Sequence, residues 1–207
     1  MPETPTPFDQ STYQVRFEWG VDGLARLAPA DVVVIVDVLG LSQAAIEAVE
    51  RGESVTTDAA PTAEALVEAA WAGGALVLLA GFRNAGAAAD AVLAEQERRG
   101  ARTSIAVVAA GAADSGALRF AVEDHLGAGA VMAALADRGI DHSSPEAAAA
   151  GESFRGLRRA TRHLLTASGS GRALAARGVP AADIVAAAAL DASTAVPRLR
   201  DGAFVGD

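Results

Sequence analysis

Apolar and polar positions alternate along this chain in blocks that predict strands and helices in turn. Tyr13–Trp19 has an apolar side chain at every second position, which is typical of a strand with one face in the core and the other in water. The continuous apolar run Val32–Val36 predicts a central strand that is buried on both faces. Helical patterns follow over Ser42–Arg51 and Pro61–Ala72, and a glycine comes directly after each of them.

Two further segments repeat the order of strand, turn and helix. Ala75–Ala80 is a predicted buried strand, and the loop Gly81–Asn84 leads into an alanine-rich helix that ends at Gly100. Ser104–Ala110 is the next predicted strand, and the loop Gly111–Leu118 separates it from another helix. Three such units predict an α/β fold with three layers, α/β/α, around a mostly parallel or mixed sheet.

The remaining segments give weaker patterns. Ser54–Thr57 reads as a short strand, and Ser144–Arg177 reads as helical with breaks near Gly151 and Ser168–Gly171. Ile184–Ala188 is a predicted strand, followed by a short finishing segment that reaches Phe204. No low-complexity linker divides the chain, so we expect one domain over residues 1–207, with residues 1–12 as a flexible arm.

Composition narrows the class of protein. The chain has 207 residues, of which 51% are hydrophobic, enough for one sizeable core. Its 26 acidic and 17 basic residues give a net charge of −9, and the acids are scattered, so nucleic acid is not an expected partner. The absence of cysteine excludes disulfides and thiolate metal sites.

Location and assembly follow from simple features of the chain. The first residues lack the basic start and apolar segment of a signal peptide. No apolar run approaches the roughly 20 residues that span a bilayer. We therefore expect a cytoplasmic protein without a membrane partner. Alanine-rich helices can pack closely across a subunit boundary, so a homo-oligomer is a further expectation.

Asp37 is the first candidate for chemistry, because it follows the buried strand at the edge where open α/β sheets bind ligands. Its carboxylate there could coordinate Mg²⁺ through oxygen, beside N–H groups of the next helix that bind an anion. The structural alternative is that Asp37 caps that helix.

Glu123 and Asp124 form a second acidic candidate. Adjacent residues point about 100° apart on a helix, so both can face one ion only within its first turn. A metal role for one of them competes with the ordinary explanation, which is that acids in a first turn interact favourably with the helix dipole.

Two basic segments are candidate anion sites. Arg83 and Asn84 follow a buried strand, and the loop Ser168–Arg172 combines hydroxyls, glycines and a guanidinium. The loop lacks the spacing and the lysine of a phosphate-binding Walker loop, and an ordinary helix start is the alternative explanation. Ser42 is well placed to cap a helix. The three histidines have no metal-ligand spacing and are expected to be structural or exposed.

Several short segments occur in one order between Val32 and Phe204. They are Val36–Leu39, Ala45–Gly52, Phe82–Ala85, Val107–Gly111, Ala121–Ala130, Ser170–Leu174, Leu190–Asp191 and Val196–Pro197. Together they resemble the 2-phosphosulfolactate phosphatase family, magnesium-dependent phosphatases of coenzyme M biosynthesis.

The resemblance implies a three-layer fold, a bound Mg²⁺ ion and hydrolysis of a small phosphorylated substrate, 2-phosphosulfolactate, to sulfolactate and phosphate. It implies that Asp37 and Asp124 are catalytic and that Asp37, Glu123 and Asp124 hold the metal. The residues implied for substrate binding are Ser42, Arg83, Asn84, Ser170 and Arg172.

The chain departs from the family pattern at several positions. The strand-end motif of typical members reads like Asp-Val-Leu-Arg-Ala-Ser/Thr-Thr, whereas Gly40 and Gln43 stand here in place of the arginine and a threonine. Ala110 replaces a usual cysteine, and the segment 83–86 replaces a motif like Thr-Asn-Gly-Thr. An alternative is therefore a small-anion-binding homologue with impaired catalysis. A third possibility, an acyl-transfer hydrolase, lacks a nucleophile-elbow motif.

Overall fold

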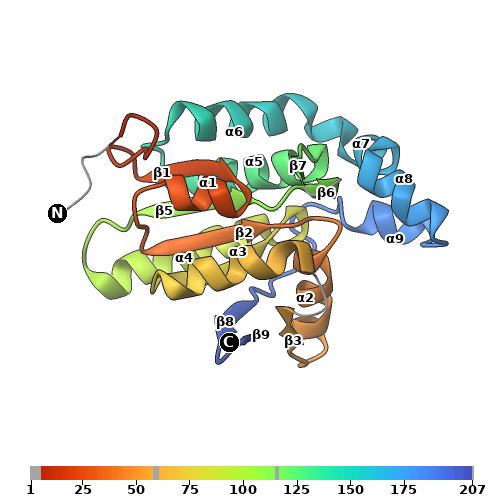
Figure 1. The fold of residues 1–207 in the computed structure, drawn as a ribbon, viewed down its shortest axis with the longest axis horizontal. Helices are drawn as coiled ribbons and strands as arrows, with labels where there is room; N and C mark the ends of the chain where they lie inside the picture. The colour runs from red at the N-terminus through yellow and green to blue at the C-terminus, as the bar shows by residue number, and fades with distance from the viewer. Residues whose placement is uncertain (1–5, 58–60, 115–116, 207) are drawn as a thin grey trace.

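A mixed β-sheet forms the centre of the molecule (Figure 1). The computed structural model describes residues 6–57, 61–114 and 117–206. Within them, one sheet has the strand order β1-β5-β2-β4-β8-β9-β3. The first four strands in this order are parallel, and β8, β9 and β3 continue the sheet antiparallel. The strands in chain order are β1 Val15–Trp19, β2 Val32–Val36, β3 Val55–Thr56, β4 Leu76–Ala80, β5 Ile105–Ala109, β8 Arg198–Arg200 and β9 Ala203–Val205.

Helices cover both faces of the sheet and give three layers. One face carries α1 Gly20–Arg26, α2 Leu41–Glu50 and α3 Pro61–Ala72. The other face carries α4 Ala85–Arg99, α5 Val122–Ala136 and α6 Pro145–Leu157. Shorter elements gather beyond the carboxyl ends of the parallel strands, at the right of Figure 1. Besides η2 Phe82–Asn84, they are η3 Arg158–Ala160, α7 Thr161–Ala167, α8 Gly169–Ala176 and α9 Ala181–Ala186.

Strand β2 shows why an uninterrupted apolar run forms the centre of this fold. Val32, Val34 and Val36 pack into the core beneath α4 and α5, whereas Val33 and Ile35 pack into the core beneath α3. All five side chains are buried. Burial of each side chain contributes about 1.5–3 kcal/mol to folding stability. The strand is therefore most stable in the middle of the sheet, where helices cover both faces.

The structure confirms the α/β fold and the mixed sheet, and most predicted elements begin and end within two residues of the observed bounds. The prediction that the polar face of β1 is in water is wrong. Arg16 on that face is 5% exposed, and its guanidinium Nη1 donates to the carbonyls of Ala28 and Pro29 at 2.8 and 3.2 Å. Part of the expected N-terminal arm is also held, since Gln10 is buried and exchanges two side-chain hydrogen bonds with the Phe17 backbone.

Three other predictions are corrected. Helix α6 runs through Gly151 without a break. The segment Ile184–Ala188 is not a strand: α9 covers most of it, because Pro180 provides a helix start and Ile184 then packs into the core from a helical turn. The predicted loop Gly111–Leu118 instead has two short strands: β6 Ala112–Asp114 pairs antiparallel with β7 Ala117–Arg119, which ends one residue past the loop.

Both ends of the sheet have a distinct structure. At one end, the outer side of β1 is bonded to the segment before α6: Val15 N donates to His142 O at 3.1 Å, and Ser144 N donates to Val15 O at 2.9 Å. At the other end, β3 has two residues, Val55 and Thr56. In the described part of the chain, no helix combines the length and apolar character needed to cross a membrane.

Candidate active site at the carboxyl ends of the strands

The candidate site lies where the chain reverses the direction in which it adds strands to the sheet. From β2 the chain moves to β4 on one side, and from β4 it returns through α4 to β5 on the other side of β2. The carboxyl ends of β2 and β5 therefore lie side by side at the edge of the sheet where open α/β sheets usually bind ligands. Asp37 follows β2 at this point, and Gly111 lies just beyond β5.

Asp124 joins the two strand ends. Its Oδ1 accepts a hydrogen bond from Val38 N at 2.7 Å, and its Oδ2 accepts one from Gly111 N at 2.9 Å. The residue lies in the first turn of α5 and is 2% exposed. Asp124 therefore fixes the start of α5 against both strands, and each of its oxygens already has a protein partner.

The carboxylate of Asp37 turns toward the start of α2. Leu41 N donates to Asp37 Oδ2 at 2.7 Å, as in a helix cap, and Ser42 Oγ accepts from Asp37 N at 3.0 Å. Asp37 itself is partly exposed, whereas Ser42 is 1% exposed. Asp37 thus caps a backbone N–H at the start of α2, as the structural alternative predicted. Its other oxygen, Oδ1, has no hydrogen bond among the described residues.

Gly40 makes this orientation of Asp37 sterically accessible. A β-carbon at position 40 would lie 2.3 Å from Asp37 Oδ2 and 2.5 Å from Oδ1. Both distances are far below van der Waals contact, so the carboxylate and a side chain at position 40 cannot occupy this space together.

Glu123 completes a group of three acids. It precedes Asp124 in the first turn of α5, so both adjacent carboxylates can lie near the carboxyl ends of β2 and β5. Glu123 is 2% exposed, and its Oε2 has no hydrogen-bond partner in the described part of the chain. A buried carboxylate oxygen without a partner is costly unless another group binds it.

The three acids influence one another. Burial raises the pKa of Asp37, the Leu41 N–H opposes that rise, and the negative charge of Glu123 adds to it. Burial raises the pKa of Asp124 well above its ordinary value, and the charge of Asp37 raises it further. The structure thus brings Asp37, Glu123 and Asp124 together, as their positions in the sequence suggested.

A divalent cation fits two of these acids better than three. Within residues 6–57, 61–114 and 117–206, no three acidic or imidazole side chains lie close enough to form a complete metal cluster. Asp37 Oδ1 and Glu123 Oε2 accept no hydrogen bond from the described residues. Mg²⁺ is commonly held by one or two carboxylates, with waters and substrate phosphate as the other ligands, so the donor set suits it.

Arg83 and Asn84 are already engaged in the protein. Arg83 Nη2 donates to Glu50 Oε1 and Oε2 at 2.8 and 3.0 Å, and Arg83 also pairs with Glu47. The Asn84 side chain is fully buried and bonds only to backbone groups: Oδ1 accepts from Gly81 N, and Nδ2 donates to the carbonyls of Leu79 and Ala195. This geometry gives Asn84 a structural function in the turn after β4.

The predicted Ser168–Arg172 loop forms the start of α8. Ser168 caps the helix, because its Oγ accepts from Gly171 N at 3.0 Å. Ser170 is partly exposed, and Arg172 is exposed with no ion pair or hydrogen bond from its guanidinium in the described residues. The site roles predicted for Ser42, Arg83, Asn84, Ser170 and Arg172 stay predictions.

Arg119 is a site candidate that the sequence reasoning missed. Its backbone oxygen lies 2.9 Å from the place of a β-carbon on Gly111, whose N–H holds Asp124. Its guanidinium Nη1 lies 2.4 Å from the place of a β-carbon on Gly169, at the start of α8. Arg119 therefore lies between Gly111, whose N–H binds Asp124, and Gly169 at the start of α8. The available signal was an arginine between the buried strand and the helix that carries the acids.

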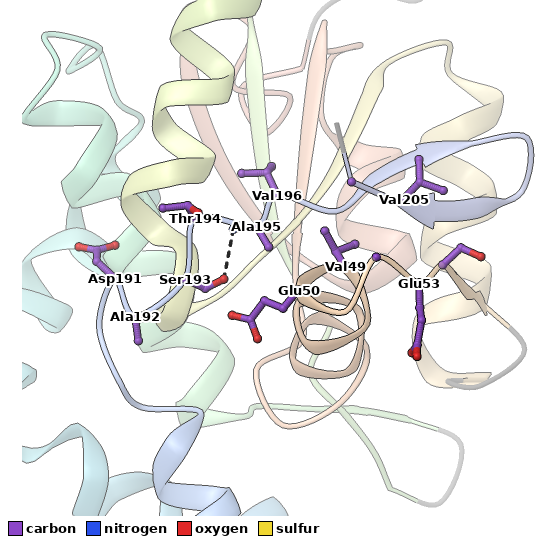
Figure 2. Close-up of a pocket in the computed structure, with 13 residues that line it drawn as sticks. Val49, Glu50, Glu53, Asp191, Ala192, Ser193, Thr194, Ala195, Val196 and Val205 are labelled. Atoms are coloured by element: carbon purple, nitrogen blue, oxygen red, sulfur yellow. Dashed lines mark hydrogen bonds between the residues drawn. The ribbon is translucent and has the colours of Figure 1, made fainter.

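A cleft of about 860 Å³ lies elsewhere, between the end of α2 and the segment before β8 (Figure 2). Figure 2 shows Glu50 and Ser193 facing each other across it, with Asp191 farther along the wall. The Ser193 hydroxyl, together with Arg83, lowers the pKa of Glu50. The wall of this cleft carries the carboxylates of Glu50, Glu53 and Asp191, of which Glu50 is paired with Arg83.

The three-layer α/β/α fold, with acidic residues at the carboxyl ends of its parallel strands, is shared by many ligand-binding proteins and enzymes. The sequence model of a family described as 2-phosphosulpholactate phosphatase matches residues 48–202. The chain therefore belongs to that family. The match includes Glu123 and Asp124 and begins after the Asp37 strand end. A search of curated proteins found no match.

Proposed function

We propose that this protein is a magnesium-dependent phosphatase that hydrolyses a small anionic phosphomonoester, with 2-phosphosulfolactate as the leading candidate. Hydrolysis would add water across the phosphate ester, break the P–O bond and release sulfolactate and inorganic phosphate. The family assignment supports the substrate class. The observation that carries the site is the buried Glu123 Oε2, which has no hydrogen-bond partner among the described residues and belongs to a side chain whose charge raises the pKa of Asp37.

The role we propose for each residue follows from the hydrogen bonds that its side chain already makes. Asp37 and Glu123 would hold the metal ion, which neutralises charge on the phosphoryl group as the P–O bond breaks. Asp124 is a positioning residue, because both of its oxygens hold strand-end backbone. Arg119 and Arg172 carry guanidiniums without acidic partners among the described residues, and each can bind a phosphate or sulfonate oxygen.

Phosphate release from 2-phosphosulfolactate, measured with added Mg²⁺ and with a chelator, tests this proposal. We expect activity only with the divalent ion. Glu123→Gln and Asp37→Asn should each lower kcat by at least a hundredfold, because each removes a metal ligand. Glu68→Gln is the matched control, since Glu68 is an exposed side chain on α3 and should leave kcat unchanged.

Calorimetry with sulfolactate and phosphate separates the phosphatase from its non-catalytic alternative. Binding of either anion without turnover of any phosphomonoester would favour an anion-binding homologue that has lost catalysis. Full activity of Glu123→Gln in the presence of chelator would exclude both the metal and this site from the reaction.

A further inference from the structure

The arginines of this acidic protein are unevenly paired. Through much of the molecule, guanidiniums bind carboxylates or backbone carbonyls, as at Arg16, Arg83, Arg99 and Arg138. A second group has no hydrogen bond or ion pair from the guanidinium within the described residues. These arginines are Arg119, Arg158, Arg159, Arg162, Arg172 and Arg177. All of them lie in β7, in η3 and α7, or in α8 and its end, beyond the carboxyl ends of the parallel strands.

Three of these unpaired arginines line one pocket. Arg158 and Arg159 of η3 and Arg162 of α7 border a cavity of about 310 Å³, with the segment 188–190 on another wall. Phe82 and Phe154 also line the cavity, and their ring centroids are 6.0 Å apart. Both aromatic side chains are buried at 1% and 5% exposure. The pocket thus has a rigid apolar base and a cationic rim.

The electrostatics of this rim point to an anionic ligand. No carboxylate side chain lines the pocket among the described residues. Three guanidiniums within a five-residue segment carry like charges, and a bound anion would offset their mutual repulsion by attracting each of them. Each guanidinium presents a planar fork that matches two oxygens of a phosphate, sulfonate or carboxylate group. The net charge of the protein is −9, so the protein as a whole does not attract anions. Any attraction must come from the three arginines at this pocket.

We propose that the pocket bordered by Arg158, Arg159 and Arg162 binds a small ligand with at least two anionic groups of the phosphate, sulfonate or carboxylate type. The binding does not depend on the proposed hydrolysis. Asp37, Glu123 and Asp124 do not line this pocket. The pocket is nevertheless near them, because Phe82 lines it and the preceding Gly81 contacts Val38, the neighbour of Asp37. The place of a β-carbon on Gly81 lies 3.7 Å from Val38 Cγ2. The ligand is therefore either the substrate, held by its remote anionic groups, or a separate effector.

Calorimetry with inorganic pyrophosphate, in buffer without divalent ions, tests the proposal directly. The variant Arg158→Gln/Arg162→Gln should bind at least tenfold more weakly than the unaltered protein, because charge-assisted contacts are lost. Arg51→Gln/Arg177→Gln is the matched control, with the same change in charge outside the pocket, and should bind within about twofold of the unaltered protein. Equal weakening in both variants, or no binding of pyrophosphate, would overturn the proposal.

Hydrogen–deuterium exchange locates the bound anion. Pyrophosphate should slow exchange in residues 158–165 and 186–190, and it should do so equally in Glu123→Gln. Protection confined to residues 37–42 and 122–126 would contradict the proposal by placing the anion at the acidic site. A substrate role then predicts a higher KM with kcat retained in Arg158→Gln/Arg162→Gln, whereas an effector role predicts unchanged KM without pyrophosphate. These outcomes separate failure of the pocket from failure of the proposed hydrolysis.

Discussion

The carboxylate of Asp37 occupies the space that a side chain on Gly40 would need. The place of a β-carbon at position 40 lies 2.3 Å from Asp37 Oδ2, the oxygen that accepts the Leu41 N–H. The resemblance to the phosphatase family places an arginine at this position in typical members. In this chain, Gly40 occurs together with an Asp37 carboxylate that turns toward the Leu41 N–H, and a side chain at position 40 would clash with that carboxylate.

Gly40→Ala should therefore destabilise the protein and disturb the site. We expect a loss of about 1–3 kcal/mol in the free energy of unfolding, as for other insertions into filled space. Gly156→Ala on α6 is the control, because a β-carbon there meets nothing within 4 Å. Urea unfolding measures the difference. Equal or greater stability of Gly40→Ala relative to this control would show that Asp37 moves aside without cost.

Asp37→Asn should change the pH dependence of stability. The pKa of Asp37 is raised in the folded protein above its ordinary value of 3.8, so the folded state binds the proton more tightly than the unfolded state. This stabilisation is present below pH 3.8 and is lost as the pH rises through the folded pKa. Relative to the unaltered protein, Asp37→Asn should become progressively more stable across that window.

Unfolding must be followed without divalent ions, because a bound cation would favour the ionised carboxylate and reverse the effect. A difference in stability between Asp37→Asn and the unaltered protein that stays constant from pH 3 to pH 8 would contradict the raised pKa.

Asp124→Asn should destabilise the start of α5. An asparagine has one acceptor oxygen, so either Val38 N–H or Gly111 N–H would face an amide donor and lose its partner. The cost of an unsatisfied buried group is about 1–3 kcal/mol. Asp183→Asn, an exposed acid in the first turn of α9, should cost much less and serves as the control. Similar losses of unfolding free energy in the two variants would refute the bridging role.

Arg119→Gln should impair the reaction more than Arg83→Gln does. The Arg83 guanidinium is neutralised by Glu50, whereas Arg119 has no acidic partner in the described residues. Loss of a charge-assisted contact of about 1.5–3 kcal/mol lowers kcat/KM tenfold or more. Steady-state kinetics on the same phosphomonoester compare the two variants. A larger defect in Arg83→Gln would restore Arg83 as the anion-binding residue.

The sequence was informative where one physical effect dominates. The apolar run Val32–Val36 can be buried only between two layers, so its central place in the sheet was predictable. Ile184 and its neighbours were harder, because a short apolar segment fits a strand or a buried helix equally well. The strands β6 and β7 also lacked a strong pattern in the sequence, and their pairing, of residues 112–114 with residues 117–119, depends on local contacts.

That Asp37 lies near Glu123 and Asp124 was predictable from position, because the carboxyl ends of parallel strands share one edge. The partners of the basic residues were not. Arg83 meets Glu50 from 33 positions earlier in the chain, and Arg119 meets the start of α8 at Gly169. Such pairings depend on how helices pack over the sheet, which periodicity in the sequence does not encode.

The two ends of the sheet bear on how the protein behaves at high concentration. An exposed, regular strand at the margin of a sheet can recruit a strand from another molecule and start a fibre. Here the backbone of Val15 is already occupied by His142 and Ser144, and the opposite margin ends in the two-residue strand β3. Neither margin therefore offers a long template for intermolecular strand addition.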